Sequence, residues 1–196
     1  MTGVRVEEPE IWGKRLQILK EAIPSASKIA YLDIRTFRES AFGRQLREEE
    51  LRKASQILEI SLTDMLVEEA TAAEYQRVFR EIAPNPPDAI IVSSTSELFP
   101  YRQLIVVLTE KSRLPAMYPA REYAEAGGLM AYGTDIAPLW RRIANDLHEV
   151  LNGANPGDIP IYQPTKFDFL VNLKAAKALG LTVPPALLAT ADEVIE

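Results

Sequence analysis

Cysteine is absent from this 196-residue sequence, and histidine occurs only once. The lack of cysteine excludes thiol nucleophiles, iron–sulfur clusters, zinc ribbons and disulfides. The single histidine, His148, excludes metal sites built from several histidines. It lies in an amphipathic helical pattern between Leu147 and Glu149, which predicts a surface position. We therefore expect no metal and no other cofactor.

The sequence has fewer basic than acidic residues: 22 Lys and Arg and 28 Asp and Glu give a net charge of −6. A chain this acidic has no electrostatic reason to bind nucleic acid or an anionic membrane. No apolar run approaches the ~20 residues that a membrane-spanning helix needs. Residues 1–9 have neither the basic n-region nor the apolar h-region of a signal peptide. We expect no nucleic-acid partner, no membrane insertion and no signal peptide within this chain.

The motifs that mark nucleotide binding and hydrolysis are also missing. No G-x-G-x-x-G follows the first expected strand, and neither G-x-x-x-x-G-K-[ST] nor G-x-S-x-G occurs. Carboxylates are plentiful, but no pair stands out as an acid and base couple. The sequence therefore contains no identified catalytic machinery, and a flavodoxin-like α/β enzyme stays only as an alternative.

What the sequence does contain is an alternation of short apolar runs and helical patterns. Its length suits one domain of roughly 100–200 residues. Helices of 10–20 residues between buried strands are typical of βαβ units, so we predict an α/β fold with a parallel sheet flanked by helices and a C-terminal helical and strand tail. Strands are expected at 28–32, 60–66, 88–93, 114–118, 129–132 and 167–172, with a charged helix before Leu58 and a helix capped by Asp135.

Ligands of parallel sheets bind outside the carboxyl ends of the strands. That rule selects the loops Asp33–Ser40, Ser93–Phe99 and Tyr118–Glu122, whose hydroxyl groups suit a small polar or zwitterionic ligand. The same hydroxyls are equally typical of turns that cap helices. Among the aromatic residues, Trp12 and Trp140 lie on helical apolar stripes and are expected in the core. Phe37, Phe99, Tyr101, Tyr118 and Tyr132 lie near strand ends, where they can either stack on a ligand or close the core.

Several segments resemble one known family. They are Glu10–Pro24, Leu114–Tyr118, Arg121-Glu122, Glu125–Gly133 with Asp135, Gln163–Phe167, Val171–Leu181, Pro184-Pro185 and Ala191–Glu196. They are similar to the ABC-transporter substrate-binding proteins that include tryptophan- and tyrosine-binding lipoproteins, which have the type I periplasmic-binding-protein fold. The resemblance implies two α/β lobes joined by a hinge, a solute bound between them, an ABC permease as partner and a periplasmic location.

On this resemblance the first lobe is missing from the chain. Residues 4–131 correspond to the second lobe, 132–165 to a crossover segment whose helix normally packs on the first lobe, and 166–196 to a C-terminal return segment. The Thr2-Gly3-Val4 stretch resembles the first hinge crossing. Because the crossover helix would have lost its partner sheet, we expect a homodimer through residues 135–152.

The resemblance also assigns candidate ligand-binding residues, all on the cleft side of the second lobe. They are Arg35, Thr36, Ser94, Thr95, Glu97, Tyr118, Arg121 and, at the hinge, Tyr132. An arginine could pair with a ligand carboxylate, Glu97 with an ammonium, and Tyr118 could stack. The expected function is the non-catalytic binding of a small polar organic solute, with an amino acid or aromatic acid favoured. A cytosolic ligand-sensing or interaction module of the same fold is the main alternative.

Overall fold

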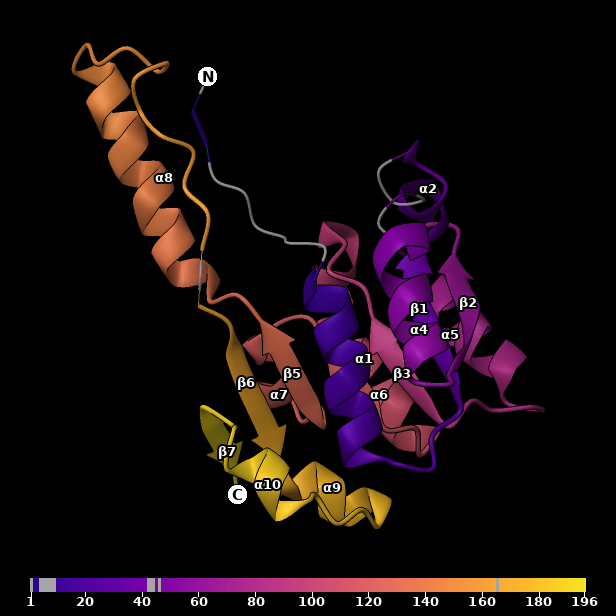
Figure 1. The fold of residues 1–196 in the computed structure, drawn as a ribbon. Coiled ribbons are helices and arrows are strands. Elements are labelled where there is room, and N and C mark those ends of the chain that lie inside the picture. Colours follow the sequence, from indigo (N-terminus) through magenta and orange to yellow (C-terminus); the bar gives the residue numbers. More distant parts are fainter. Residues whose placement is uncertain (1, 4–9, 42–44, 46, 165) are drawn as a thin grey trace.

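The computed structural model describes residues 2–3, 10–41, 45, 47–164 and 166–196. Its strands form one seven-stranded sheet in the order β2-β1-β3-β4-β5-β6-β7 (Figure 1). The strands are β1 Lys28–Ile34, β2 Ser61–Val67, β3 Ala89–Val92, β4 Ala116–Tyr118, β5 Met130–Gly133, β6 Asp168–Asn172 and β7 Glu193–Ile195. Strands β1 to β5 are parallel, β6 is antiparallel to β5, and β7 is parallel to β6. The predicted fold class, a mostly parallel sheet flanked by helices, is confirmed.

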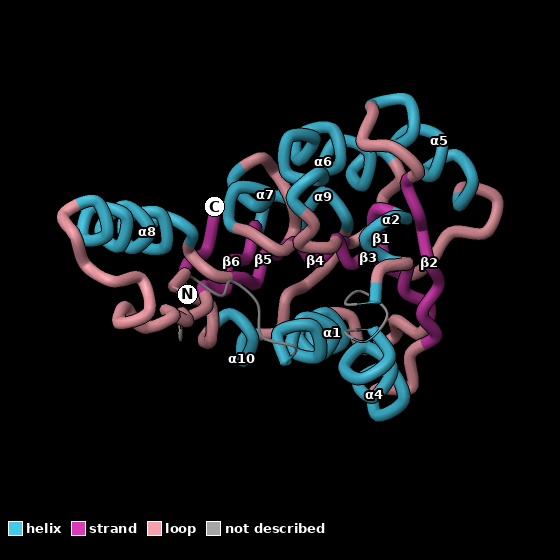
Figure 2. The backbone as a smooth tube through the Cα atoms, turned by 90° about the horizontal axis from the view of Figure 1, so that it is seen from above, coloured by secondary structure: helices cyan, strands magenta, loops and turns pink. Residues whose placement is uncertain are grey.

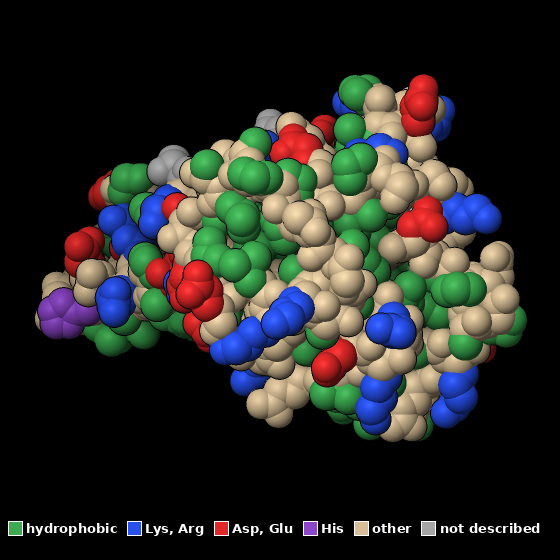
Figure 3. Space-filling view, turned by 90° about the horizontal axis from the view of Figure 1, so that it is seen from below, with side chains coloured by type: hydrophobic (Ala, Val, Ile, Leu, Met, Phe, Trp, Pro, Cys, Tyr) green, Lys and Arg blue, Asp and Glu red, His purple; other side chains and the backbone are tan. Residues whose placement is uncertain are grey.

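Helices cover both faces of this sheet (Figure 2), with α1, α4 and α10 on one side and α5, α6 and α7 on the other. The helices are α1 Glu10–Ala22, α2 Arg35–Arg38, η1 Arg47–Leu51, α4 Arg52–Ile57, α5 Ala72–Ile82, η2 Ser96–Tyr101, α6 Arg102–Lys111, α7 Arg121–Glu125, α8 Ile136–Leu151, α9 Leu173–Leu179 and α10 Pro185–Leu188. At the amino ends of the parallel strands, Figure 3 shows side chains of both charge signs interspersed with apolar ones.

The core lies on both faces of the central strands. Strand β3 reads Ala-Ile-Ile-Val and every residue in it is buried, as a continuous apolar run between two helical layers predicts. Because side chains alternate across a strand, Ile91 packs with Trp12 on the α1 side and Ile90 packs with Tyr75 on the α5 side. The prediction that Trp12 is a core residue is confirmed, since it is 1% exposed.

One local prediction is wrong, and one strand was not predicted. Strand β1 continues to Ile34, so Asp33 lies inside a buried strand instead of a polar loop, and α2 begins directly at Arg35. The charged helix predicted before Leu58 is present as η1 and α4, which follow one another without a break, while the part of the prediction at residues 42–44 and 46 lies outside the described residues. Strand β7 was not predicted.

Helix α8 extends away from the sheet, and the segment after it runs back beside it (Figure 1). Asp135 caps it as predicted, because its carboxylate accepts a hydrogen bond of 2.9 Å from the Ala137 amide. His148 is exposed, also as predicted. Trp140, however, is 66% exposed, so its predicted core position is wrong. The amphipathic pattern identified the helix but not the surface that would cover it.

Candidate ligand-binding site

A pocket of about 700 Å³ opens at the carboxyl ends of β3 and β4, between the first half of α1 and the start of α8. This is the edge of the sheet that the parallel-strand rule selected. Its apolar wall consists of Ile11, Trp12, Phe37, Phe99, Pro119, Ala120, Tyr123, Ile136 and Trp140. Its polar wall consists of Arg15, Ser93, Ser94, Thr95, Ser96, Glu97 and Thr134. A mostly apolar cavity with a few polar groups is typical of sites for small organic ligands.

Arg15 holds together the strand ends that frame this pocket. It projects from α1 and is 1% exposed. Its Nε donates to the Tyr132 carbonyl at 2.8 Å and its guanidinium donates to Ser94 Oγ at 2.9 Å and to the Pro119 carbonyl at 3.2 Å. These acceptors follow or end β3, β4 and β5, so one side chain fixes the relative positions of three strand ends.

Close packing at the same place requires a glycine. The backbone at Gly133, the last residue of β5, approaches the loop after β4 so closely that a Cβ atom there would lie 1.8 Å from the Pro119 carbonyl oxygen. Any larger residue would push the ends of β4 and β5 apart. Together with the Arg15 hydrogen bonds, this approach makes the edge of the pocket rigid.

A buried carboxylate supports the floor of the pocket. Asp33 is 1% exposed, and its Oδ1 accepts hydrogen bonds from Thr95 Oγ1 at 2.7 Å and from the Ile34 amide at 2.8 Å. Thr95 Oγ1 also shares a hydrogen bond of 2.8 Å with Ser93 Oγ. Burial raises the pKa of Asp33 to about 6, although the Thr95 and Ile34 hydrogen bonds oppose the rise. The loop that carries Thr95 is therefore anchored from beneath.

Two polar atoms on the wall lack a hydrogen-bond partner among the described residues. They are Nε1 of Trp12, whose side chain is almost fully buried, and Oγ1 of Thr134. Buried donors without an acceptor are uncommon in proteins because leaving them unpaired costs free energy.

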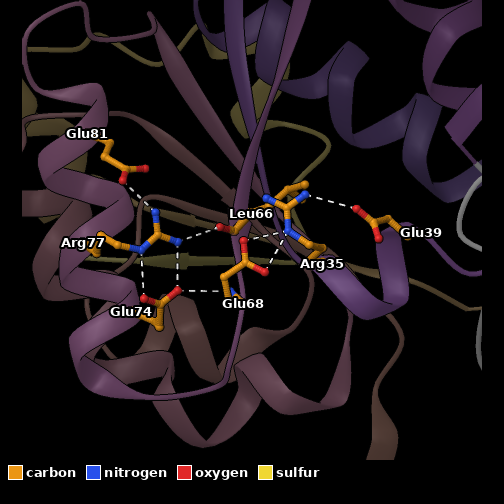
Figure 4. A network of polar contacts seen from close by, with 7 residues as sticks. All are labelled: Arg35, Glu39, Leu66, Glu68, Glu74, Arg77 and Glu81. Carbon is orange, nitrogen blue, oxygen red and sulfur yellow. Dashed lines mark hydrogen bonds and ion pairs between the residues drawn. The ribbon is translucent and has the colours of Figure 1, made fainter.

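Of the predicted site residues, Ser94, Thr95 and Glu97 come together in this pocket. Arg35 lies outside its lining. Figure 4 shows the Arg35 guanidinium between two carboxylates, at 2.7 Å from Glu68 and 3.1 Å from Glu39. Thr36 follows on α2 and is exposed, also outside the lining.

Tyr118 points away from the pocket. It is 1% exposed, its hydroxyl shares a hydrogen bond of 2.6 Å with Thr109 Oγ1, and burial raises its pKa. Its ring stacks on Tyr123 at 5.1 Å between centroids and lines a smaller cavity of about 210 Å³ beside Gly128. Tyr118 thus packs beneath Tyr123, which does line the pocket.

The other two predicted residues are engaged elsewhere. Arg121 pairs with Glu125 at 3.1 Å, Asp168 at 3.6 Å and Glu193 at 2.5 Å. Tyr132 contributes its carbonyl to Arg15, while its ring lies against Phe167 at 5.8 Å between centroids. Neither side chain is part of the pocket lining.

Sequence analysis missed the walls formed by α1 and α8, above all Trp12, Arg15 and Trp140. The parallel-strand rule considers only the loops that follow strands, whereas these residues lie on helices that form the other walls of the pocket. One signal was available: Arg15 interrupts an otherwise apolar helical stripe of Ile11, Trp12, Leu16 and Leu19. A cation in an apolar stripe needs buried hydrogen-bond acceptors, so the position of Arg15 indicates a polar site.

Other kinds of site find no support in the described part of the chain. No group of His, Asp or Glu there is arranged to hold a metal ion. None of the helices described is long and apolar enough to cross a membrane.

The fold and the pocket define a class, the ligand-binding α/β lobe. The family is more specific, because residues 1–195 match the ABC transporter substrate binding proteins, and the chain belongs to that family. Such proteins bind solutes for transport and do not transform them, which confirms the predicted family and non-catalytic role. A comparison with curated proteins finds no match.

Solved structures show the same fold. A conserved domain protein from Vibrio cholerae has a TM-score of 0.84 at 22% identity, over 98% of this chain and 62% of its own. An ABC domain from Streptococcus pneumoniae in complex with L-Trp has a TM-score of 0.83 at 23% identity, over 99% of this chain and 64% of its own. A ligand-free, open substrate-binding protein with adhesive properties from Clostridium difficile has a TM-score of 0.62 at 18% identity, over 93% and 59%. The chain therefore spans less than two thirds of the length of these proteins.

Proposed function

We propose that this chain is the second lobe and crossover segment of the solute-binding component of an ABC importer, acting in the periplasm with an ABC permease. Its solute is a small polar organic molecule, with an amino acid or an aromatic acid favoured, and it binds in the pocket at the interlobe cleft. The observation that carries the proposal is the pocket itself, which is large enough for a small organic ligand, mostly apolar, and placed at the carboxyl ends of the strands.

The division into a lobe (4–131), a crossover (132–165) and a return segment (166–196) stays a proposal, and its start at residue 4 lies outside the described residues. It is supported by a contact between two segments that lie far apart in the sequence. The Tyr162 amide donates to the Gly3 carbonyl at 2.9 Å, so the residues expected at two crossings between lobes are in contact. Strands β6 and β7 of the return segment complete the sheet of the lobe.

The homodimer through residues 135–152 also stays a proposal. It is supported by the exposure of apolar side chains on one side of α8, where Trp140, Leu147 and Leu151 are 66%, 56% and 77% exposed. A contiguous apolar surface of this kind is typical of protein interfaces.

A thermal-shift screen of amino acids and aromatic acids at millimolar concentration tests the solute proposal. A ligand at 100 times its Kd stabilises the chain by about 2.7 kcal/mol, which raises Tm by several degrees. The affinity is expected to be weak, because closure by another lobe would supply further contacts and exclude water.

Trp140→Ala removes an exposed wall of the pocket and should reduce the Tm shift. Leu151→Ala, on the same helix but outside the pocket lining, is the matched control and should leave the shift unchanged. The absence of a shift with every compound tested would contradict a working site in this chain.

A further inference from the structure

We propose that the chain has a second small-molecule site, and that this site takes a neutral molecule with one aromatic ring and one hydroxyl group, that is, a phenol. The site is the cavity of about 210 Å³ at the amino ends of β4 and β5. Among the described residues, it shares no lining residue with the larger pocket at the carboxyl ends of the strands. The inference therefore goes beyond the proposed function and does not depend on it.

Three elements that are distant in the sequence enclose this cavity. The end of α6 and the segment after it form one wall, the turn at residues 127–129 before β5 forms the second, and α9 forms the third. Figure 1 shows α9 below the amino ends of the parallel strands. The cavity therefore lies on the opposite side of the body from the larger pocket.

Small residues keep this space open. Helix α9 contributes Ala175 and Ala178 to the lining, and the turn contributes Gly127 and Gly128. At Gly128 a Cβ atom would lie 2.5 Å from Cε2 of Tyr118, so a larger residue would displace the tyrosine ring from the inner wall. Protein interiors contain few voids larger than a water molecule, so a cavity of this volume is suited to a ligand.

The volume and the apolar wall select a single aromatic ring. A cavity of about 150 Å³ that is lined by Leu, Ile and Phe binds benzene. The lining here includes Val106, Leu114, Leu129, Leu179 and Tyr118. Its volume of about 210 Å³ accommodates one ring with a small substituent.

The charged residues of the lining favour a neutral ligand. They are Glu110, in the last turn of α6, and Arg113, just after that helix, and both are exposed. Every other lining residue is uncharged. Because the two charges have opposite signs, the cavity attracts neither cations nor anions strongly.

A buried hydroxyl group supplies the polar contact. Thr109 and Tyr118 both line the cavity, and Thr109 Oγ1 donates its proton to the Val106 carbonyl at 2.7 Å. The hydrogen bond of 2.6 Å between Thr109 Oγ1 and Tyr118 Oη is therefore donated by the tyrosine. Burial raises the pKa of Tyr118, so this hydroxyl stays protonated. No described residue donates to Tyr118 Oη, which leaves it able to accept a hydrogen bond from a ligand hydroxyl.

The same tyrosine separates the second site from the larger pocket. The Tyr118 ring stacks on Tyr123 at 5.1 Å between centroids, and Tyr123 lines the larger pocket. A ring bound on one side of this stacked pair contacts different residues from a ring bound on the other side. The two locations can therefore be distinguished by the residues that respond to binding.

4-Fluorophenol and fluorobenzene test the proposal, because they share a ring and differ in the hydroxyl group. Fluorine NMR titrations of the full chain measure their affinities, and amide-resolved NMR spectra locate the bound ring. We expect 4-fluorophenol to bind at least about threefold more tightly than fluorobenzene. The amide signals of Gly127, Gly128 and Ala178 should shift, whereas those of Ser94 and Glu97 in the larger pocket should not.

Two variants test the cavity and its acceptor separately. Ala175→Leu fills the space and should weaken the binding of both compounds at least about tenfold. Ala186→Leu makes the same change at an exposed position on α10, outside the lining, and should leave both affinities unchanged. Tyr118→Phe keeps the ring and removes the acceptor, so it should lower the affinity for 4-fluorophenol to that for fluorobenzene. Circular dichroism and Tm check that the variants fold.

Each part of the proposal can be overturned. The second site is wrong if neither compound binds, if the amides that shift are those of Ser94 and Glu97, or if Ala175→Leu binds both compounds as tightly as Ala186→Leu does. The assignment of a phenol is wrong if Tyr118→Phe still prefers 4-fluorophenol. If Ala175→Leu does not fold, Tyr118→Phe and the amide shifts decide. A failure of the solute screen would leave this site untouched.

Discussion

The α/β body and the projecting helix α8 have similar apolar patterns, but the apolar side chains are buried in the body and several of them are exposed on α8. In the body, Ile29 and Ile91 are 0% exposed, whereas Leu147 and Leu151 on α8 are 56% and 77% exposed. Both regions have the residues that form regular structure, and α8 even has a side-chain cap at Asp135. An apolar stripe thus specifies an element and one of its faces, while burial of that face requires a second surface.

Within α8 itself, one strip is covered and another is not. Leu139 and Asp146 are buried, as is Ile159 in the segment that returns beside the helix, and Arg142 of α8 lies 5.7 Å from the ring centroid of Tyr162 in that segment. Trp140, Leu147 and Leu151 lie on the other strip. The described residues therefore cover only part of the apolar surface of α8.

The largest expected effect is a loss of folding stability caused by a substitution in the core of the α/β body. Ile91→Ala in β3 removes a fully buried side chain between α1 and the sheet, and it should lower the free energy of unfolding by about 2–5 kcal/mol through lost burial and a residual cavity. Chemical denaturation monitored by circular dichroism measures the loss. A change below about 1 kcal/mol would contradict the packing at the centre of the sheet.

The second prediction concerns a polar group inside the body. The pKa of Asp33, about 6, lies above the 3.8 of an unperturbed Asp, so the folded chain binds this proton more tightly than the unfolded chain does. The stability contributed by Asp33 is therefore present at low pH and is lost as the pH rises through about 6. Asp33→Asn keeps an acceptor for Thr95 and removes the titration.

The difference in unfolding free energy between Asp33→Asn and the unaltered chain should accordingly shift by about 2 kcal/mol in favour of the variant between pH 4 and pH 7.5. Denaturation curves across this pH range measure it. Asp158→Asn, at an exposed loop position, serves as the control and should give a flat difference. A flat difference for Asp33→Asn too would show that the carboxylate is not desolvated.

The fold was predictable where the signal is local. The run Ala89–Val92 indicated a doubly covered strand, and Asp135 indicated where α8 begins. The end of β1 was not predictable in this way, because one of the two hydrogen bonds that stabilise the buried Asp33 carboxylate comes from Thr95, which lies 62 residues further along the chain, and the other from the Ile34 amide. Tertiary partners override the polarity of a single residue.

The sequence located the strand-end loops of the pocket but not the helices that form its other walls, since Phe37, Ser94–Glu97, Phe99, Pro119 and Ala120 all come from the three loops that the parallel-sheet rule selected. Ser94, Thr95 and Glu97 follow a strand that the sequence identifies clearly, so the parallel-sheet rule found them. Arg35 follows a strand too, but Glu68 and Glu39 occupy its guanidinium, and Glu68 comes from beyond the neighbouring strand β2. Arg15 and Trp12 reach the pocket from a helix packed across the sheet, a relation that sequence spacing does not contain.

The smallest expected effect on stability lies on α8 and sharpens the comparison with Ile91→Ala. Leu147→Ala removes a side chain of similar size that is 56% exposed, and it should change the free energy of unfolding by no more than about 0.5 kcal/mol. Its effect should appear in assembly instead. Trp140, Ala144, Leu147 and Leu151 recur at helical spacing on one exposed strip, so a second copy can pack along it.

Sedimentation velocity at micromolar concentration tests that assembly directly. We expect the unaltered chain to sediment as a dimer and Leu147→Glu as a monomer, because the dimer would have to bury an unpaired carboxylate. Arg141→Glu, at an exposed position on the polar side of the same helix, is the control and should remain dimeric. If the unaltered chain sediments as a monomer, the homodimer proposal is wrong, and the exposed strip of α8 is a surface for a different partner. The apolar side chains of the body would then be covered by the chain's own fold, and those of α8 by another protein.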